Sequence, residues 1–176
     1  KKITLMLIFV LLISKQNSVT QALLIDQFVR MLEDGLSFKQ VTSKLEPLMA
    51  SARIFFTVGS LDYLQMGGRI GKVATAATGK LGLNLLLLWK TEILVLGGIG
   101  RNRNKLKVQC LQAAKKYLDE NGKDNFIVSV GYGYDKEEGF QFMNEVESAL
   151  DVKLNTETNV AIGIVSAVHT GHILLV

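Results

Sequence analysis

The sequence predicts an α/β protein, with helices packed against a mixed β-sheet. Apolar residues recur at helical spacing in some segments, while other segments are continuous runs of β-branched and aromatic residues. The two kinds of segment alternate along the chain, and glycine-rich stretches separate them. The length of 176 residues allows one domain, or one domain and part of another.

The composition is that of a folded protein with a core. Hydrophobic residues make up 48% of the chain and charged residues 20%, which is too apolar for a disordered protein. The net charge of +4 is mild and spread along the chain, so we expect no nucleic-acid partner. A single cysteine, Cys110, excludes a disulfide framework and fits a reducing compartment, so we expect a cytoplasmic protein.

An apolar run over residues 3–13 follows Lys1 and Lys2, which is the outline of a secretory signal. No small residues spaced for cleavage follow it, and it is shorter than the ~20 residues of a transmembrane helix. We therefore expect a buried strand and no transmembrane segment, with a signal-like segment or an anchor as alternatives. The chain starts without Met and stops inside the apolar run 173–176, so both ends are expected to be cut from a longer protein.

Two helices are expected in the first third of the chain. Apolar residues at helical spacing over 20–34 end at Gly35, a typical helix stop. Ser37 and Gln40 form a capping-box pattern that predicts a second helix, which Pro47 kinks or ends.

The remaining elements follow from the same patterns. A basic stretch with Arg101 leads into the helix around 108–118, and glycine-rich turns separate several of the other segments. In order, we expect a strand at 53–58, a loop with short helical pieces at 59–72, a hairpin of 83–89 and 93–96, a helix carrying 108–118 and stopping near Gly122, a strand at 126–130, a helix at 135–150, and strands at 152–154 and 160–168.

Four basic residues lie two apart, a spacing that places them on one face of a strand but on opposite sides of a helix. No aromatic residue is interleaved with them for base stacking. A solvated charge run is the expected interpretation, and the alternative is a binding module for an acidic partner, a phosphate or a nucleic acid. The residues are Arg101, Arg103, Lys105 and Lys107.

A glycine-rich turn at 131–134 sits where a dinucleotide-binding loop would be. Lys136 replaces the third glycine of that pattern, and Asp135 with its acidic neighbours would repel a pyrophosphate. An ordinary tight turn is therefore expected, and a phosphate-using enzyme is the alternative. Spacing alone indicates no catalytic triad or carboxylate pair, so we expect no enzymatic activity.

The pair His169 and His172 follows the strand expected at 160–168. A metal site needs a third ligand, and no acidic residue or cysteine is near in sequence, so no metal is expected. Two interpretations remain open. His169 is a structural histidine, or His169 and Thr170 donate hydrogen bonds to a ligand at the mouth of an apolar cavity.

Several short motifs occur in the order found in one known family. They are Ser14-Lys15-Gln16-Asn17-Ser18, Leu61-Asp62-Tyr63-Leu64, Gly67-Gly68-Arg69-Ile70, Gly100-Arg101, and Gly163 with His169-Thr170-Gly171. In this combination the chain resembles the DegV family of bacterial fatty-acid-binding proteins, from about Ser14 to Gly171. It departs from the family pattern at Ile13, which replaces an Asp, at Asn84-Leu85, which replaces Lys-Pro, and at His172-Ile173, which replaces Pro-Gly.

The resemblance implies two α/β lobes with a fatty acid bound between them, its tail buried and its carboxylate held at the lobe junction. Residues 1–58 would be the remnant of an N-terminal lobe, and residues 59–176 the C-terminal lipid-binding lobe. The resemblance also implies a protein that needs no cofactor. It would present its fatty acid to a fatty acid kinase, which makes acyl-phosphate for phospholipid synthesis.

The same resemblance implies roles for individual residues. His169, Thr170 and Gly171 would bind the ligand carboxylate, and Arg69 and Arg101 would contact the kinase or the reacting phosphate.

Overall fold

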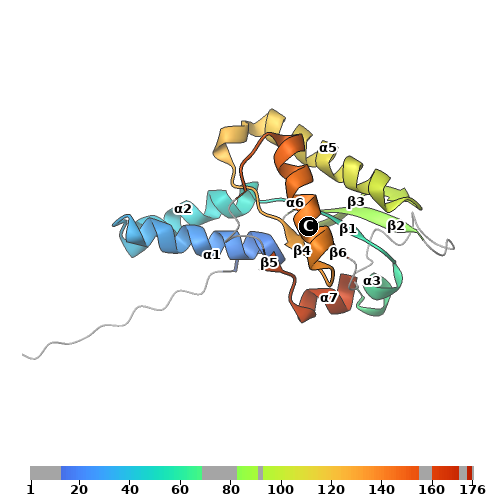
Figure 1. Ribbon diagram of the computed structural model, residues 1–176. Coiled ribbons are helices and arrows are strands. Elements are labelled where there is room, and N and C mark those ends of the chain that lie inside the picture. Colours follow the sequence, from blue (N-terminus) through green and yellow to red (C-terminus); the bar gives the residue numbers. More distant parts are fainter. Residues whose placement is uncertain (1–12, 69–82, 91–92, 155–159, 171–173, 176) are drawn as a thin grey trace, which may run out of the picture.

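The computed structural model describes residues 13–68, 83–90, 93–154, 160–170 and 174–175, with six strands in one mixed sheet (Figure 1). The strand order is β3-β2-β1-β6-β4-β5, and helices pack around the sheet. This confirms the predicted α/β class. Among the described residues, no helix is both long enough and apolar enough to cross a membrane.

Helices α1 (Ser18–Glu33) and α2 (Phe38–Ser51) form a hairpin that extends away from the sheet (Figure 1). Gly35 has a φ of +86° in the turn between them, a conformation that glycine adopts without strain. Ser37 caps α2 by accepting a hydrogen bond from the backbone of Gln40, and the side chain of Gln40 accepts one from the backbone of Ser37. The capping box is confirmed. Pro47 lies inside α2 and does not end it.

Strands β1 (Ile54–Val58), β2 (Asn84–Lys90) and β3 (Ile93–Gly100) form an antiparallel unit, which confirms the predicted strand and hairpin. The other three strands are two residues long each. Strand β6 (Leu174–Leu175) pairs antiparallel with both β1 and β4 (Gly131–Tyr132), and β4 pairs parallel with β5 (Val160–Ala161).

Side chains alternate between the two faces of β1. Ile54, Phe56 and Val58 join one apolar cluster, which also contains Leu85 and Leu87 of β2. On the opposite face, Phe55 packs against a cluster of Leu86, Leu106 and Cys110. That second face carries α5 (Arg103–Asn121), and α6 (Lys136–Leu150) supplies most of a third cluster. Three more helical segments lie within the described residues, and all are short: α3 (Asp62–Met66), η2 (Lys123–Asn125) and α7 (Ile164–Thr170).

The strand predicted at 160–168 is wrong beyond Ala161. Gly163 interrupts the β-branched run, and its carbonyl oxygen accepts hydrogen bonds from the backbone N–H groups of Ser166 and Ala167. These bonds start α7, which packs against α3, so tertiary contacts override the strand propensity of this run.

The strands predicted at 126–130 and 152–154 are also wrong. The Val130 carbonyl accepts a backbone hydrogen bond from Val160, but the paired strand itself begins at Gly131, opposite Val160 of β5. Val152 and Leu154 instead donate backbone hydrogen bonds to the carbonyl and the side chain of Glu147, which closes the end of α6.

The strand expected at 3–13 falls outside the described residues, apart from an exposed Ile13. The lobe boundary between residues 58 and 59 stays a prediction.

Candidate functional site

One edge of the sheet gathers the motif residues. Strands β1 and β4 both run antiparallel to β6, and β5 runs parallel to β4, so β1, β4 and β5 have their C-terminal ends at this edge. Helices α3, α6 and α7 follow these three strands, and α5 follows the end of β3 at the same edge. Ligands of α/β proteins commonly bind at the carboxyl ends of the strands.

Helices α3 and α7 bring Gly67 and His169 into contact, although 101 residues separate them in sequence. A Cβ atom added to Gly67 would overlap the imidazole of His169, with Nδ1 the nearest atom. Gly67 has an ordinary helical φ of −78°, so the backbone there does not require glycine. The position requires glycine because the imidazole fills the space of a side chain.

His169 is half-buried in the last turn of α7, not in a loop after a strand. Its Nδ1 atom is buried and has no hydrogen-bond partner within the described part of the chain. The hydroxyl of Thr170 donates to the backbone carbonyl of Ser166 at 2.9 Å, one turn earlier in the helix. Gly171 lies outside the described residues. The imidazole therefore offers a buried polar nitrogen at this edge.

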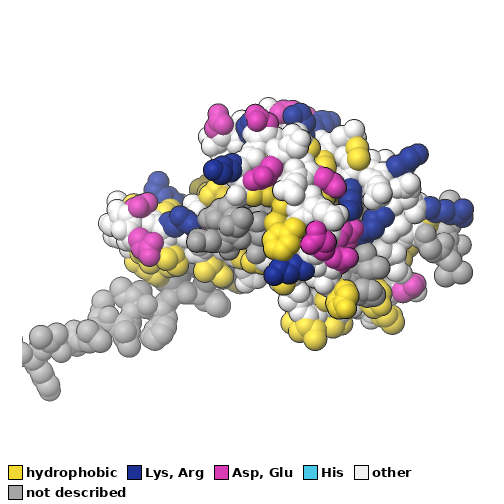
Figure 2. Space-filling model, in the orientation of Figure 1, with side chains coloured by type: hydrophobic (Ala, Val, Ile, Leu, Met, Phe, Trp, Pro, Cys, Tyr) yellow, Lys and Arg dark blue, Asp and Glu magenta, His cyan; other side chains and the backbone are white. Residues whose placement is uncertain are grey.

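The outer surface of this region is apolar. Ile164, Val165 and Val168 of α7 and Met66 of α3 are exposed, and Figure 2 shows hydrophobic side chains gathered over these two helices.

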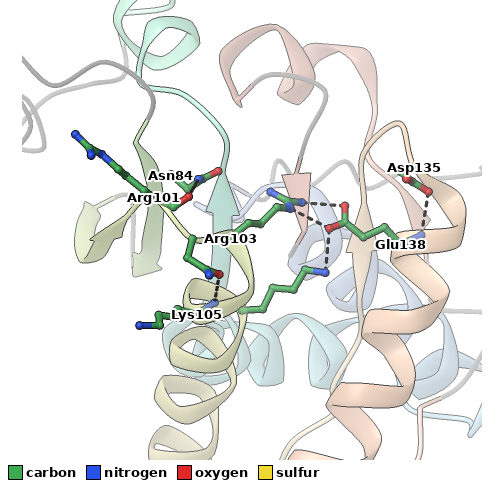
Figure 3. Close-up of polar contacts among 8 residues, drawn as sticks. Asn84, Arg101, Arg103, Lys105, Asp135 and Glu138 are labelled. Atoms are coloured by element: carbon green, nitrogen blue, oxygen red, sulfur yellow. Dashed lines mark hydrogen bonds and ion pairs between the residues drawn. The ribbon is translucent and has the colours of Figure 1, made fainter.

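Arg101 is exposed at the end of β3, at the same edge of the sheet. Its carbonyl oxygen accepts a hydrogen bond from the Asn84 side chain at 3.2 Å, while its guanidinium points away from Arg103 and Glu138 (Figure 3). A guanidinium in this position is available to an anionic partner. Arg69 lies outside the described residues.

Arg103 and Lys107 contact the same carboxylate, that of Glu138 on α6, and Figure 3 shows Arg103 directed at Glu138. The Arg103 guanidinium forms two hydrogen bonds, from Nε to Oε1 at 2.9 Å and from Nη2 to Oε2 at 3.0 Å. Lys107 Nζ lies 2.9 Å from Oε1. The prediction of a solvated charge run is therefore wrong for these two residues, while Arg101 and Lys105 are exposed as predicted.

The start of α5 explains this difference. Asn102 caps α5 by accepting a hydrogen bond from the backbone of Lys105 at 3.0 Å, so the helix begins at Arg103. Arg103 and Lys107 are then four residues apart on one helix face, with Lys105 on another. Asn102 is the sequence signal that could have predicted this arrangement.

The hydrogen bond from Arg103 is the main cause that holds the pKa of Glu138 below its usual value, against an opposing effect of burial. One carboxylate offsets only one of the two cations. Arg103 Nη1 is buried and, among the described residues, has no hydrogen-bond partner. The start of α5 therefore keeps a positive charge at this edge.

The sequence profile of the family described as "Uncharacterised protein, DegV family" matches residues 9–175. The chain belongs to the DegV family. A DegV domain-containing protein of Clostridium acetobutylicum is 29% identical over 161 residues, which cover 90% of this chain and 55% of that protein.

Solved structures of fatty-acid-binding proteins share the fold. One from Eubacterium ventriosum, described as a fatty acid (stearic acid)-binding protein, is 80% identical, with a TM-score of 0.89. The match covers 92% of this chain and 55% of that one. A DegV protein of Thermus thermophilus, described by its fatty acid binding, is 24% identical, with a TM-score of 0.73 over 92% of this chain and 57% of that one. The chain thus spans about half the length of the relatives it matches.

Proposed function

We propose that this chain is part of a bacterial protein that binds a long-chain fatty acid without converting it, and that His169 donates a hydrogen bond to the fatty acid carboxylate. The observation that carries the proposal is the buried Nδ1 of His169, which has no partner among the described residues. The Eubacterium ventriosum protein, described as binding stearic acid, supports the ligand class because it is 80% identical to this chain.

A carboxylate is the chemistry that suits this position. A hydrogen bond to an ionised acceptor is about twice as strong as one between neutral groups, and partial burial strengthens it further. The contact with Gly67 fixes the imidazole ring, so little side-chain entropy is lost on binding. Thr170 and Gly171, which follow directly, belong to the same proposed carboxylate site.

Apolar burial supplies most of the affinity in this proposal. About 15 methylenes at about 0.8 kcal/mol each give roughly 12 kcal/mol, against an association cost of about 4 to 15 kcal/mol. A few polar contacts to the carboxylate then suffice for useful affinity. A protein of this kind needs no cofactor.

The exposed Arg101 supports a second part of the proposal, in which the bound fatty acid is presented to a fatty acid kinase in the cytoplasm for phospholipid synthesis. A kinase that forms acyl-phosphate must bring phosphate to the carboxylate, so cations are needed nearby. Arg101 lies at the same sheet edge as His169, and Arg69 follows Gly67 and Gly68 closely in sequence. These two arginines are the proposed contacts with the kinase or the phosphate.

Mass spectrometry tests the ligand directly. The full-length protein that contains this chain is purified from a bacterial host, and its organic extract is analysed. We expect one fatty acid per protein, of about 16 to 18 carbons. A protein that carries no fatty acid and does not bind added stearate would contradict the proposal.

A further inference from the structure

One asparagine of the chain, Asn121, is followed by a glycine, and the other asparagines are followed by larger residues. Asn121 is the last residue of α5, and both Asn121 and Gly122 are exposed to solvent. Helix α5 rises by about 1.5 Å per residue, so this end lies about 27 Å from Arg103 at its start (Figure 1). The pair is therefore remote from the sheet edge that carries the candidate carboxylate site.

The backbone nitrogen of Gly122 differs from its counterparts at the ends of other helices. At the ends of α1, α2 and α6, the N–H of the residue after the helix donates to a carbonyl of the last turn, that of Arg30, Leu48 or Glu147. Gly122 makes no such hydrogen bond among the described residues, because its φ of +83° and ψ of +98° take the backbone out of helical geometry. The nitrogen that follows Asn121 is thus not held by the helix.

An exposed nitrogen beside an asparagine has a known chemistry. The backbone nitrogen attacks Cγ of the asparagine side chain, and the new N–Cγ bond closes a succinimide ring. The side-chain amide leaves as ammonia and takes the proton of the backbone nitrogen with it. Water then opens the ring at either carbonyl, which gives aspartate or isoaspartate. A hydrogen bond on the nitrogen and a side chain on the following residue both slow the attack, and neither protects Asn121.

Within the described part of the chain, one hydrogen bond holds the side chain of Asn121. Its Nδ2 donates to the backbone carbonyl of Tyr117 at 2.8 Å, in an exposed position. Water competes with such a bond, so it restrains the side chain only weakly. We propose that Asn121 is a site of spontaneous deamidation, which gives the protein a second, more acidic form with a weaker end of α5. The formal net charge of the chain falls from +4 to +3 in this form.

The contacts around Asn121 explain why the end of α5 weakens. A carboxylate has no N–H to donate to the Tyr117 carbonyl, and a negative charge at the C-terminus of a helix opposes the helix dipole. Isoaspartate also adds a methylene group to the backbone just before a turn, in which the Asn125 N–H donates to the Gly122 carbonyl at 3.0 Å. The Tyr117 hydroxyl donates to the Ser51 carbonyl at 2.7 Å, so the same turn of α5 holds the end of α2.

A second Asn-Gly pair separates the effect of structure from that of sequence. Asn104 is exposed near the start of the same helix, and the N–H of the next residue, Lys105, donates to Asn102 Oδ1 at 3.0 Å. The substitution Lys105→Gly creates an Asn-Gly pair there, with its nitrogen engaged in the helix cap. The full-length protein that carries Lys105→Gly is incubated at pH 8, and peptide mass spectrometry follows both asparagines over time.

We expect Asn121 to convert to isoaspartate and aspartate at least about tenfold faster than Asn104, because Asn104 reacts only when the first turn of α5 opens. In otherwise unchanged protein, Asn121→Gln should abolish the more acidic form on ion exchange, because glutamine must close a larger and less favourable ring. Equal rates at the two pairs would overturn the proposal, since the sequence and not the helix end would then set the rate. An unmodified Asn121 after the same incubation would also overturn it.

The effect on α5 has its own test. Asn121→Asp mimics the aspartate product, and Asn144→Asp, at an exposed position inside α6, is the control with the same change in charge. We expect Asn121→Asp to lower the melting temperature of the full-length protein by about 2 °C and to speed hydrogen exchange in the last turn of α5, with less effect from the control. Equal effects of the two substitutions would contradict a weaker end of α5.

Discussion

Strand β2 of the sheet and helix α1 of the α1–α2 hairpin differ in how far their apolar residues are buried. Leu85, Leu86 and Leu87 of β2 are almost completely buried, in the apolar clusters on the two faces of the sheet. In the hairpin, Ile25 and Val29 of α1 are exposed, and hydrophobic side chains line one side of the hairpin in Figure 2. Strand β2 thus buries its central apolar residues within the described structure, whereas the side of α1 that carries Ile25 and Val29 is exposed.

Helix α1 is apolar on two sides. On one side, Val19 and Leu23 line a cavity together with residues of β1 and α5. On the outer, exposed side, Ile25, Val29 and Leu32 recur every three or four residues. A helix that is apolar on two sides is typical of burial from two sides. We therefore expect the rest of the full-length protein to cover the outer side of α1, in keeping with the expected N-terminal lobe.

Core truncations give the largest expected contrast. Leu86→Ala should cost about 2–5 kcal/mol of unfolding free energy, because Leu86 is fully buried between β2 and α5. Leu32→Ala, its match in the hairpin, should cost less than about 1 kcal/mol in this chain. Denaturant unfolding measures both variants. Equal costs would contradict the comparison, and a larger cost of Leu32→Ala in the full-length protein would show that its apolar side becomes covered there.

Gly67→Ala tests the contact between α3 and α7 within the sheet region. The added methyl group overlaps the His169 imidazole and should destabilise the protein by about 1–3 kcal/mol. Combining it with His169→Ala should recover most of that loss, because the smaller side chain leaves room. Gly163→Ala is the control, since its methyl group would meet no atom within 4 Å. Additive effects of the two substitutions would refute the contact.

The ion cluster between α5 and α6 gives an intermediate effect that depends on pH. Glu138→Gln leaves Arg103 and Lys107 without a counter-charge and should cost about 1–2 kcal/mol at pH 7 after allowance for solvent screening. Glu137→Gln, on an exposed neighbour, should cost little. The folded-state pKa of Glu138 lies below the ordinary value of 4.5 for a glutamate. Its contribution is therefore present above about pH 4.5 and lost as the pH falls through the folded-state pKa.

Unfolding curves of these two variants between pH 3 and pH 7 check this sign. The difference in stability between wild type and Glu138→Gln should shrink as the medium becomes acidic. A difference that is constant over this range would contradict the role of the Glu138 carboxylate.

The smallest expected effect lies in the hairpin. Ser37→Ala removes the capping box of α2 and should cost about 1 kcal/mol. Because the outer side of α1 is exposed while the centre of β2 is buried, this loss should appear as faster hydrogen exchange in α2 before global unfolding. Exchange that accelerates equally in β2 and α2 would mean that the hairpin and the sheet unfold as one unit.

Elements with strong local signals were predictable from the sequence. The capping box at Ser37, the stop at Gly35 and the antiparallel hairpin are confirmed because short-range patterns determine them. The run after Val160 was not predictable in this way. Its β-branched residues favour a strand, but Gly163 and the packing of α7 on α3 produce a helix.

The candidate site was predictable only in part. The motifs indicate His169 and Arg101 individually, but the contact between Gly67 and His169 depends on the topology of the whole sheet. The shared carboxylate of Glu138 was missed for a similar reason, because it comes from a helix 35 residues beyond Arg103. Local spacing contains no information about such pairings.

The most direct test of the fatty acid site is stearate binding to the full-length protein that contains this chain, measured by titration for wild type, His169→Ala and His172→Ala. Loss of a charge-assisted hydrogen bond predicts that His169→Ala weakens binding by at least about tenfold while the melting temperature of the ligand-free protein changes little. His172→Ala, which removes the other histidine, should bind stearate like wild type. Unchanged stearate affinity in a folded His169→Ala protein would contradict the account.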